Sequence, residues 1–246
     1  MSGRSQITQD AELSSESKDR LGLLLKSRSI TGIIFDFDGV VVDSENHWPV
    51  VENPYIDQYC TGWQDEFYGQ LTGMGLSEVY DLLTSRYDFS KSKEQYFEDY
   101  EKMALELYGN IAMPIAGIEE LLDCLKQNHI SASIASSSKP AWIRAALKKH
   151  DLDGYFQDIT SSHDPEITHG KPAPDVYLGA IAKQIGGPDS LMAIEDSTNG
   201  IRAAKAAGLF CIALNIDGTN LQDTSGADAE ITTYDCLTRT LHKRID

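Results

Sequence analysis

The sequence predicts an α/β fold, in which a parallel sheet core is flanked by helices and carries a small helical insertion. Two observations predict it. Short apolar runs alternate with helical stretches from Pro114 to the end of the chain, and this alternation is typical of parallel strands joined by helices. Residues 44–110 interrupt the pattern, because aromatic and acidic residues recur there at helical spacing with few strand-like runs.

The first apolar run, residues 32–35, leads directly into Asp36-Phe37-Asp38-Gly39. A short β-rich run that ends in two acids and a glycine indicates a strand delivering carboxylates to the edge of a sheet. Side chains at i and i+2 of a strand share a face, so Asp36 and Asp38 are expected to project into one crevice. Neighbouring carboxylates repel unless a cation neutralises them or one is protonated. Both conditions suit a carboxylate nucleophile beside a general acid and a metal, although a plain turn is the alternative.

The second apolar run, residues 131–135, ends in Ser136, Ser137 and Ser138, and Pro140 opens a helical stretch. Hydroxyl and free backbone N–H groups at such a junction favour an anion. Ser136 comes first after the strand and is the predicted phosphate contact. Simple N-capping by serine is the alternative.

Two further segments complete the pattern. Lys171 lies between Gly170 and Pro172 on a loop that two prolines stiffen, where it can stabilise phosphoryl oxygens. The run 191–194 ends in Glu195 and Asp196, before a helix, and adjacent carboxylates of this kind suit Mg²⁺. Ligands of open α/β sheets bind beyond the carboxyl ends of the strands, so the four segments are expected to converge there.

Taken together, these segments resemble the four motifs of the haloacid dehalogenase superfamily. Four local sequences are similar to those of its β-phosphoglucomutase-like phosphatase branch: DFDGVVVDSE, IASSSK, GKPAPDVY and IEDSTNGIRAAKAAG. The resemblance extends from about Ile30 to about Leu214. The resemblance implies a Rossmann-like core, an aspartyl-phosphate on Asp36, and Asp38 as general acid and then base. It also implies that Ser136 and Lys171 hold phosphoryl oxygens, with Gly39 and Ser137 beside them. The implied Mg²⁺ ligands are Asp36, the Asp38 backbone carbonyl, Asp196 and Glu195.

The resemblance further implies that the helical insertion is a cap that closes over the substrate. The expected division is a polar, disordered extension over 1–29, a core over 30–43 and 111–246, and a cap over 44–110. Glu45, in the hinge 43–45, and His47, just after it, are expected near the substrate. Mutases of this branch typically carry a cap arginine for a second phosphate. The comparable stretch 71–77 has no basic side chain, which favours a phosphatase, although Arg86 could reach in.

Composition sets limits on the partners. The chain has 246 residues, a net charge of −17 and a pI near 4.6, which disfavours nucleic acid and anionic membranes. No apolar run approaches the roughly 20 residues that span a membrane. Four scattered cysteines indicate free thiols in a reducing compartment, so a cytoplasmic location is expected. The six histidines show no zinc-binding spacing.

These observations predict a Mg²⁺-dependent phosphatase acting on a small phosphorylated metabolite, such as a sugar phosphate or phosphoglycolate. A monomer or weak homo-oligomer is expected. Two alternatives remain open at this point: a phosphomutase of the β-phosphoglucomutase type, and a non-catalytic binding protein that keeps the fold.

Overall fold

The computed structural model describes residues 29–64, 68, 71, 74–216 and 222–242. Its centre is a parallel sheet in the order β10-β9-β8-β1-β6-β7. The strands are β1 (Gly32–Phe35), β6 (Ser131–Ser136), β7 (Phe156–Ser161), β8 (Leu191–Glu195), β9 (Phe210–Leu214) and β10 (Ala229–Ile231). The predicted parallel α/β sheet is therefore confirmed. The expected N-terminal extension lies outside the described residues, apart from Ser29.

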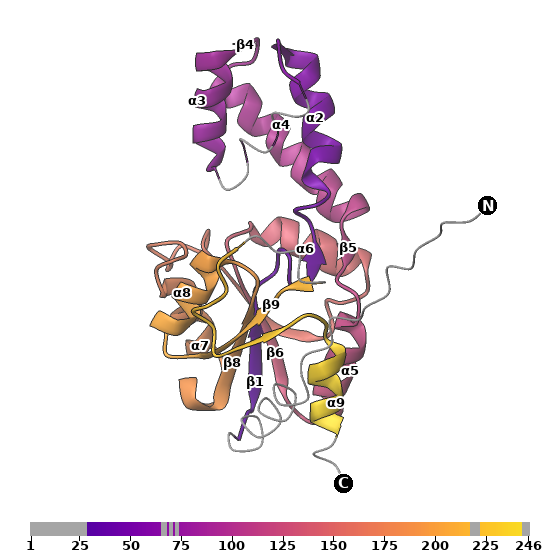
Figure 1. Cartoon of the computed structure of the whole chain (residues 1–246), viewed down its shortest axis with the longest axis vertical. Coiled ribbons are helices and arrows are strands. Elements are labelled where there is room, and N and C mark those ends of the chain that lie inside the picture. The colour runs from indigo at the N-terminus through magenta and orange to yellow at the C-terminus, as the bar shows by residue number, and fades with distance from the viewer. Residues whose placement is uncertain (1–28, 65–67, 69–70, 72–73, 217–221, 243–246) are drawn as a thin grey trace, which may run out of the picture.

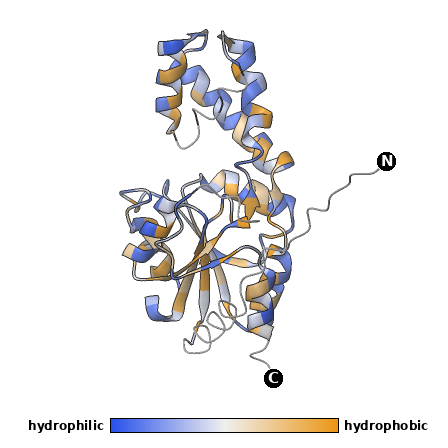
Figure 2. Cartoon of the chain, in the orientation of Figure 1, coloured by the Kyte–Doolittle hydropathy of each residue, from blue (hydrophilic) through white to orange (hydrophobic). Residues whose placement is uncertain are grey.

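Helices cover both faces of this sheet (Figure 1). On one face lie α5 (Ile118–Gln127), α6 (Pro140–Lys149) and α9 (Asp235–His242), and on the other lie α7 (Asp175–Ala182) and α8 (Thr198–Ala206). A short 3₁₀ helix, η3 (Pro188–Ser190), precedes β8. Hydrophobic residues concentrate in the strands and on the helix sides that face them (Figure 2). Burial of these two apolar layers holds the strands in register.

The register places the ends of three strands together. Phe35 of β1 pairs with Ile134 of β6 on one side and with Ile194 of β8 on the other. The next residue, Asp36, therefore lies beside the ends of β6 and β8. After β1 the chain adds β6 and β7 on one side of it, and then returns to add β8, β9 and β10 on the other side. A reversal of strand order of this kind opens a crevice at the carboxyl edge of the sheet.

The segment between β2 (Val42–Asp43) and β5 (Met113–Pro114) is mainly helical. It contains α2 (Trp48–Tyr59), α3 (Leu76–Arg86), α4 (Lys93–Glu106) and the π-helix η2 (Leu107–Ile111), with a two-stranded ribbon of β3 (Cys60–Thr61) and β4 (Asp88–Phe89). A separate apolar cluster that includes Ile56, Leu83 and Tyr96 forms its interior. The pairing of β2 with β5 joins the two connections to the sheet.

A polar contact also fixes the lower end of α4 to the sheet domain. Glu101 on α4 forms an ion pair with Lys139 and accepts a hydrogen bond of 2.7 Å from Trp142 Nε1. Figure 1 shows the helical segment above the end of the sheet at which Asp36 lies. No described helix is both long enough and apolar enough to cross a membrane.

Replacing Ile34 with alanine tests the packing that positions β1. Its side chain is fully buried, so Ile34→Ala should lower the free energy of unfolding by about 3 kcal/mol through lost burial and the cavity left behind. Urea denaturation followed by circular dichroism measures the change. Leu178→Ala on α7, where the side chain is 49% exposed, serves as the control and should cost under about 1 kcal/mol. Equal losses in both variants would contradict the packing role.

Candidate functional site

A buried lysine joins two of the predicted acids. Lys171 forms an ion pair with Asp36 and a second one, at 2.6 Å, with Glu195 Oε1. All three side chains are at most one-tenth exposed. Burial alone would lower the pKa of Lys171, but the two carboxylates raise it above its usual value, so the ammonium stays charged.

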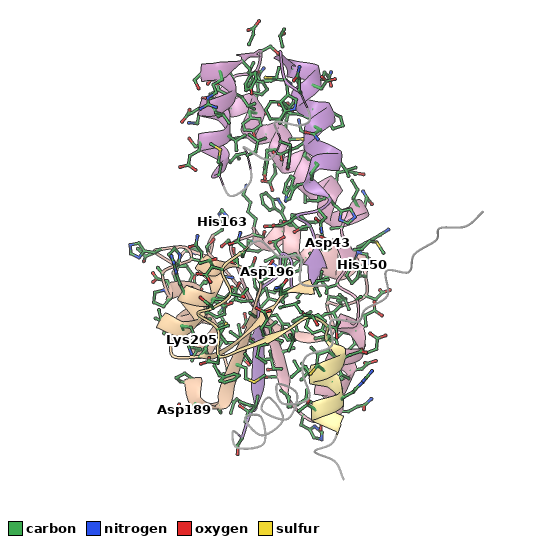
Figure 3. The ribbon with its side chains drawn as sticks, viewed as in Figure 1. Asp43, His150, His163, Asp189, Asp196 and Lys205 are labelled. Carbon is green, nitrogen blue, oxygen red and sulfur yellow. The ribbon has the colours of Figure 1, made fainter. Side chains whose placement is uncertain are left out.

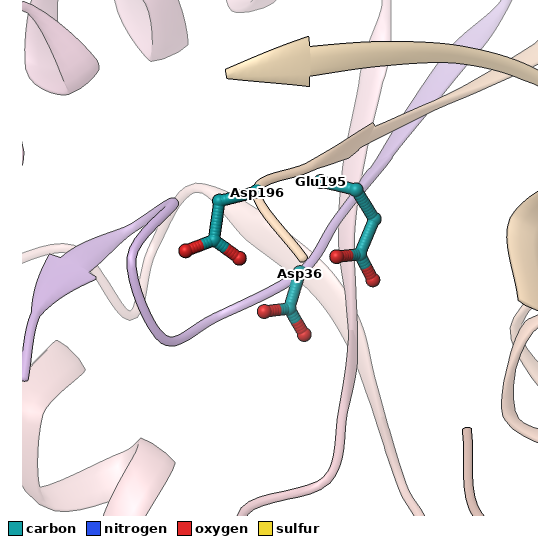
Figure 4. Close-up of side chains that lie close together, drawn as sticks. All are labelled: Asp36, Glu195 and Asp196. Atoms are coloured by element: carbon teal, nitrogen blue, oxygen red, sulfur yellow. The ribbon is translucent and has the colours of Figure 1, made fainter. Parts of the chain in front are cut away.

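The carboxylates of Asp36, Glu195 and Asp196 form one group, with one oxygen of each within 4.8 Å of the others (Figure 4). Asp36 follows β1, and the other two stand at the end of β8. Asp196 lies at the end of the sheet nearest the helical segment, and Asp189 at the opposite end (Figure 3). The expected convergence of these acids with Lys171 is therefore what the structure shows.

Gly39 is required by this arrangement. Its φ of +73° lies in the left-handed region, which side-chain-bearing residues rarely adopt. A Cβ at this position would collide with the Asp196 carboxylate. The glycine thus lets the loop after β1 pass directly beside the acids.

The group fits a divalent cation. Three carboxylates face one ammonium, so the charges near Lys171 leave an excess of negative charge in a buried site. Burial raises the pKa of Asp36, and the charges of Glu195 and Asp38 raise it further against the opposing effect of Lys171. Burial likewise raises the pKa of Asp196. A cation bound by these oxygens would favour the ionised carboxylates, and an all-oxygen donor set suits Mg²⁺.

Glu195 is held by neighbours that the sequence analysis did not identify. Tyr177 on α7 donates a hydrogen bond of 2.7 Å to Glu195 Oε1, and the Ser197 hydroxyl donates one of 3.2 Å to Oε2. Gly200 on α8 packs so closely that a Cβ there would overlap this carboxylate. The orientation of Glu195 is therefore fixed from both sides.

The Asp38 carboxylate accepts hydrogen bonds from three hydroxyl groups, whereas the Asp36 carboxylate pairs with Lys171. Ser44 and Tyr108 donate hydrogen bonds of 2.5 and 2.6 Å to its Oδ1, and Ser138 donates one of 2.6 Å to Oδ2. Its side chain does not belong to the acidic group among the described residues. The expected role of its backbone carbonyl as a metal ligand stays a prediction.

Tyr108 reaches Asp38 from the π-helix η2, an irregular turn of a kind that often occurs at functional sites. Its ring stacks on Trp142 of α6 at 5.9 Å and meets the edge of Trp48 of α2 at 6.2 Å. The side chain is almost fully buried. Sequence reasoning missed Tyr108, because it lies 70 positions from Asp38 and no motif surrounds it.

The serine loop after β6 has a clear internal order. Ser136 is fully buried, and its hydroxyl accepts a hydrogen bond of 2.9 Å from the Ser138 backbone N–H. Ser137 is exposed, and its backbone carbonyl accepts a bond from Ser162. The structure therefore brings Ser138, rather than Ser137, to Asp38. The phosphate-binding roles of Ser136 and Ser137 stay predictions.

Glu45 and His47 lie on the first connection to the helical segment. Glu45 lines a pocket in that segment together with Trp48. His47 instead turns back on its own chain, where its Nδ1 lies 2.6 Å from the Asp43 carbonyl oxygen. Their predicted substrate contacts stay predictions.

The chain matches a known family over most of its length. The haloacid dehalogenase-like hydrolase family profile covers residues 33–214. A probable pseudouridine-5′-phosphatase of Drosophila melanogaster is 28% identical over 205 residues, which are 81% of this chain and 88% of that protein. The putative phosphatase YhcW of Bacillus subtilis (strain 168) is 31% identical over 186 residues, 74% of this chain and 82% of the relative.

A solved structure agrees with the fold. The putative β-phosphoglucomutase from Thermotoga maritima superposes with a TM-score of 0.74 and covers 88% of this chain and 100% of its own, at 23% identity. That likeness concerns the fold alone. With the family profile and the curated relatives, the family resemblance expected from the sequence is confirmed: the chain belongs to the haloacid dehalogenase-like hydrolase family, and these curated relatives are named as phosphatases.

Proposed function

We propose that this protein is a Mg²⁺-dependent phosphatase that hydrolyses a small phosphorylated metabolite through an aspartyl-phosphate on Asp36. The observation that carries the proposal is the buried contact of Asp36 with Lys171, beside two further carboxylates at the end of β8. Relatives named as phosphatases support a phosphoric monoester hydrolase. The substrate proposed at this level is of the sugar phosphate or phosphoglycolate type.

The chemistry assigns one task to each side chain. A carboxylate oxygen of Asp36 attacks phosphorus, and the P–O bond to the leaving alkoxide breaks. Lys171 lies against this carboxylate, where its charge offsets the negative charge of the phosphoryl oxygens. Asp38 gives a proton to the alkoxide and later takes one from the water that hydrolyses the acyl phosphate.

The acidic group is proposed to hold Mg²⁺. Asp36, Asp196 and Glu195 supply carboxylate oxygens within one small volume, and the Asp38 carbonyl is the further expected ligand. The bound cation would neutralise charge on the phosphoryl group and orient it.

The wider assignments are part of the same proposal. Residues 44–110 are proposed to act as a cap over a core formed by 30–43 and 111–246. Ser136 and Ser137, with the backbone at Gly39, are proposed to contact the phosphoryl oxygens, and Glu45 and His47 the substrate. All four cysteines are free thiols, which supports a cytoplasmic location.

Replacement of the nucleophile gives the most direct test. Asp36→Asn should reduce phosphate release by on the order of 10⁴-fold or more, as loss of a catalytic nucleophile does in other enzymes. Released phosphate is assayed over a panel of phosphorylated metabolites with Mg²⁺ present. Asp189→Asn, which neutralises an exposed acid at the opposite end of the sheet, should keep activity. Full activity in Asp36→Asn with an unchanged circular dichroism spectrum would refute the nucleophile.

Removal of the cation should stop turnover reversibly. Dialysis against EDTA should abolish phosphate release, and added Mg²⁺ should restore it. Mg²⁺ should also raise the melting temperature, because a ligand at 100 times its Kd stabilises the folded state by about 2.7 kcal/mol. Asp196→Asn should weaken this thermal shift. If activity persisted after chelation and Mg²⁺ did not change the melting temperature, the metal assignment would be wrong.

Tyr108 is expected to position Asp38. Tyr108→Phe keeps the stacked ring and removes one of the three hydroxyl donors to this carboxylate. The rate of alkyl phosphate hydrolysis should fall about tenfold, because a misplaced Asp38 would lose part of the roughly 10²–10⁴-fold that general acid–base catalysis contributes. Phosphoenzyme formation from p-nitrophenyl phosphate, whose leaving group needs little protonation, should be spared.

The matched control is Tyr155→Phe, which removes a hydroxyl that bonds Asp123 away from the site. It should leave both rates unchanged. If Tyr108→Phe slowed alkyl phosphate hydrolysis and phosphoenzyme formation from p-nitrophenyl phosphate equally, Tyr108 would have a structural role only.

A further inference from the structure

A pocket of about 200 Å³ lies inside the helical segment. Its walls combine aromatic rings, aliphatic side chains and two acids. The lining residues include Glu45, Trp48, Glu52, Tyr68 and Tyr100. Trp48 and Tyr100 stack on each other at 4.8 Å. Apolar walls with a few fixed polar groups are the usual composition of a small-molecule site.

The pocket adjoins the proposed reaction site. The ring of Trp48 packs at right angles against that of Tyr108, whose hydroxyl donates a hydrogen bond to Asp38. Glu45 also lines the pocket, and the preceding residue, Ser44, donates a hydrogen bond of 2.5 Å to Asp38 Oδ1. A phosphate ester held at Asp36 would therefore extend its organic part toward this pocket.

Glu52 is the buried acid in the wall of this pocket. The residue is 6% exposed, and its Oε2 accepts a hydrogen bond of 2.5 Å from Tyr68. No donor to its Oε1 is found in the described part of the chain. Burial raises the pKa of Glu52, while the Tyr68 hydrogen bond lowers it. This second carboxylate oxygen, Oε1, can accept a hydrogen bond from a ligand hydroxyl.

None of the described residues that line the pocket is a lysine, arginine or histidine. Between residues 48 and 85 the sequence contains no lysine, arginine or histidine. Farther along the segment, Lys91 pairs with Asp99 and Lys93 with Asp81, and neither lysine lines the pocket. An anionic group placed here would meet two carboxylates and no counter-charge, which is the repulsive element that specificity requires.

We propose that this pocket binds an uncharged, hydroxyl-bearing leaving group and that Glu52 determines the specificity, by accepting a hydroxyl hydrogen bond and repelling anionic groups. The inference rests on the proposed phosphatase function and narrows it. Monophosphates of polyols or sugars fit the pocket. Phosphoglycolate, other phosphorylated acids and bisphosphates do not.

Two matched substrate pairs test this inference. Glycerol 3-phosphate and 3-phosphoglycerate differ only in a CH₂OH or carboxylate end, as do glucitol 6-phosphate and 6-phosphogluconate. With Mg²⁺ present, kcat/KM should be at least about tenfold higher for the member of each pair that has the CH₂OH end. Where both members of a pair are hydrolysed too slowly to measure, they are compared as competitive inhibitors of acetyl phosphate hydrolysis. The member with the CH₂OH end should then have a Ki at least about tenfold lower than that of the acidic member.

The variant Glu52→Gln keeps an acceptor for Tyr68 and removes the charge. It should narrow the ratio within each pair about tenfold, chiefly through a lower KM or Ki for the acidic member. Glu98→Gln neutralises an exposed acid on α4 and should leave the ratio and the activity unchanged. Thermal melting monitored by circular dichroism confirms that both variants are folded.

The outcomes separate the two proposals. If acetyl phosphate and every ester resist Mg²⁺-dependent hydrolysis, the phosphatase function itself fails. If acetyl phosphate is hydrolysed but wild-type enzyme does not discriminate within the pairs, or Glu52→Gln keeps the wild-type ratio, the specificity inference alone is overturned. A preference for glucosamine 6-phosphate over glucose 6-phosphate, which carries a hydroxyl in place of the ammonium group, would also overturn it, because the pocket would then select a cation.

Discussion

The buried ion pairs of Lys171 with Asp36 and Glu195 are the interaction on which the site depends. Three charged groups that burial would otherwise disfavour stabilise one another, and the strand register of β1 and β8 places the acids within reach of a single ammonium. Removing the lysine would leave two carboxylates uncompensated in a buried site, which is strongly destabilising. The same excess of negative charge, with Asp196 added, is what makes the group suitable for a divalent cation.

A second constraint links the helical segment to the chemistry. Asp38 receives hydroxyl hydrogen bonds from the first connection through Ser44, from the π-helix through Tyr108, and from the loop after β6 through Ser138. Because Tyr108 also packs between aromatic rings of α2 and α6, the position of the proposed proton donor depends on how the helical segment sits on the sheet. The pocket in the helical segment and the acidic group at the sheet edge are thereby linked by direct packing.

Much of the fold could be predicted from local patterns. Apolar runs that end in acids or serine marked the ends of β1, β6 and β8, and Pro140 marks a helix start that the structure has. The acids and Lys171 could be brought together because parallel strands align their carboxyl ends at one edge. The partners of these groups could not be predicted. Tyr177 contacts Glu195 from a helix, where a buried tyrosine has the same pattern as any core residue.

The sequence by itself determined the sheet, the helical insertion and the chemical identity of the groups at the sheet edge. These follow from periodicity and from short motifs, which act over a few residues. Only the tertiary structure decided which way Asp38 turns, that Ser138 rather than Ser137 meets it, and that Glu52 stands buried with a spare acceptor in a pocket without positive charge. Those features arise from side chains packed across distant segments, and their geometry is set by the whole fold rather than by neighbouring residues.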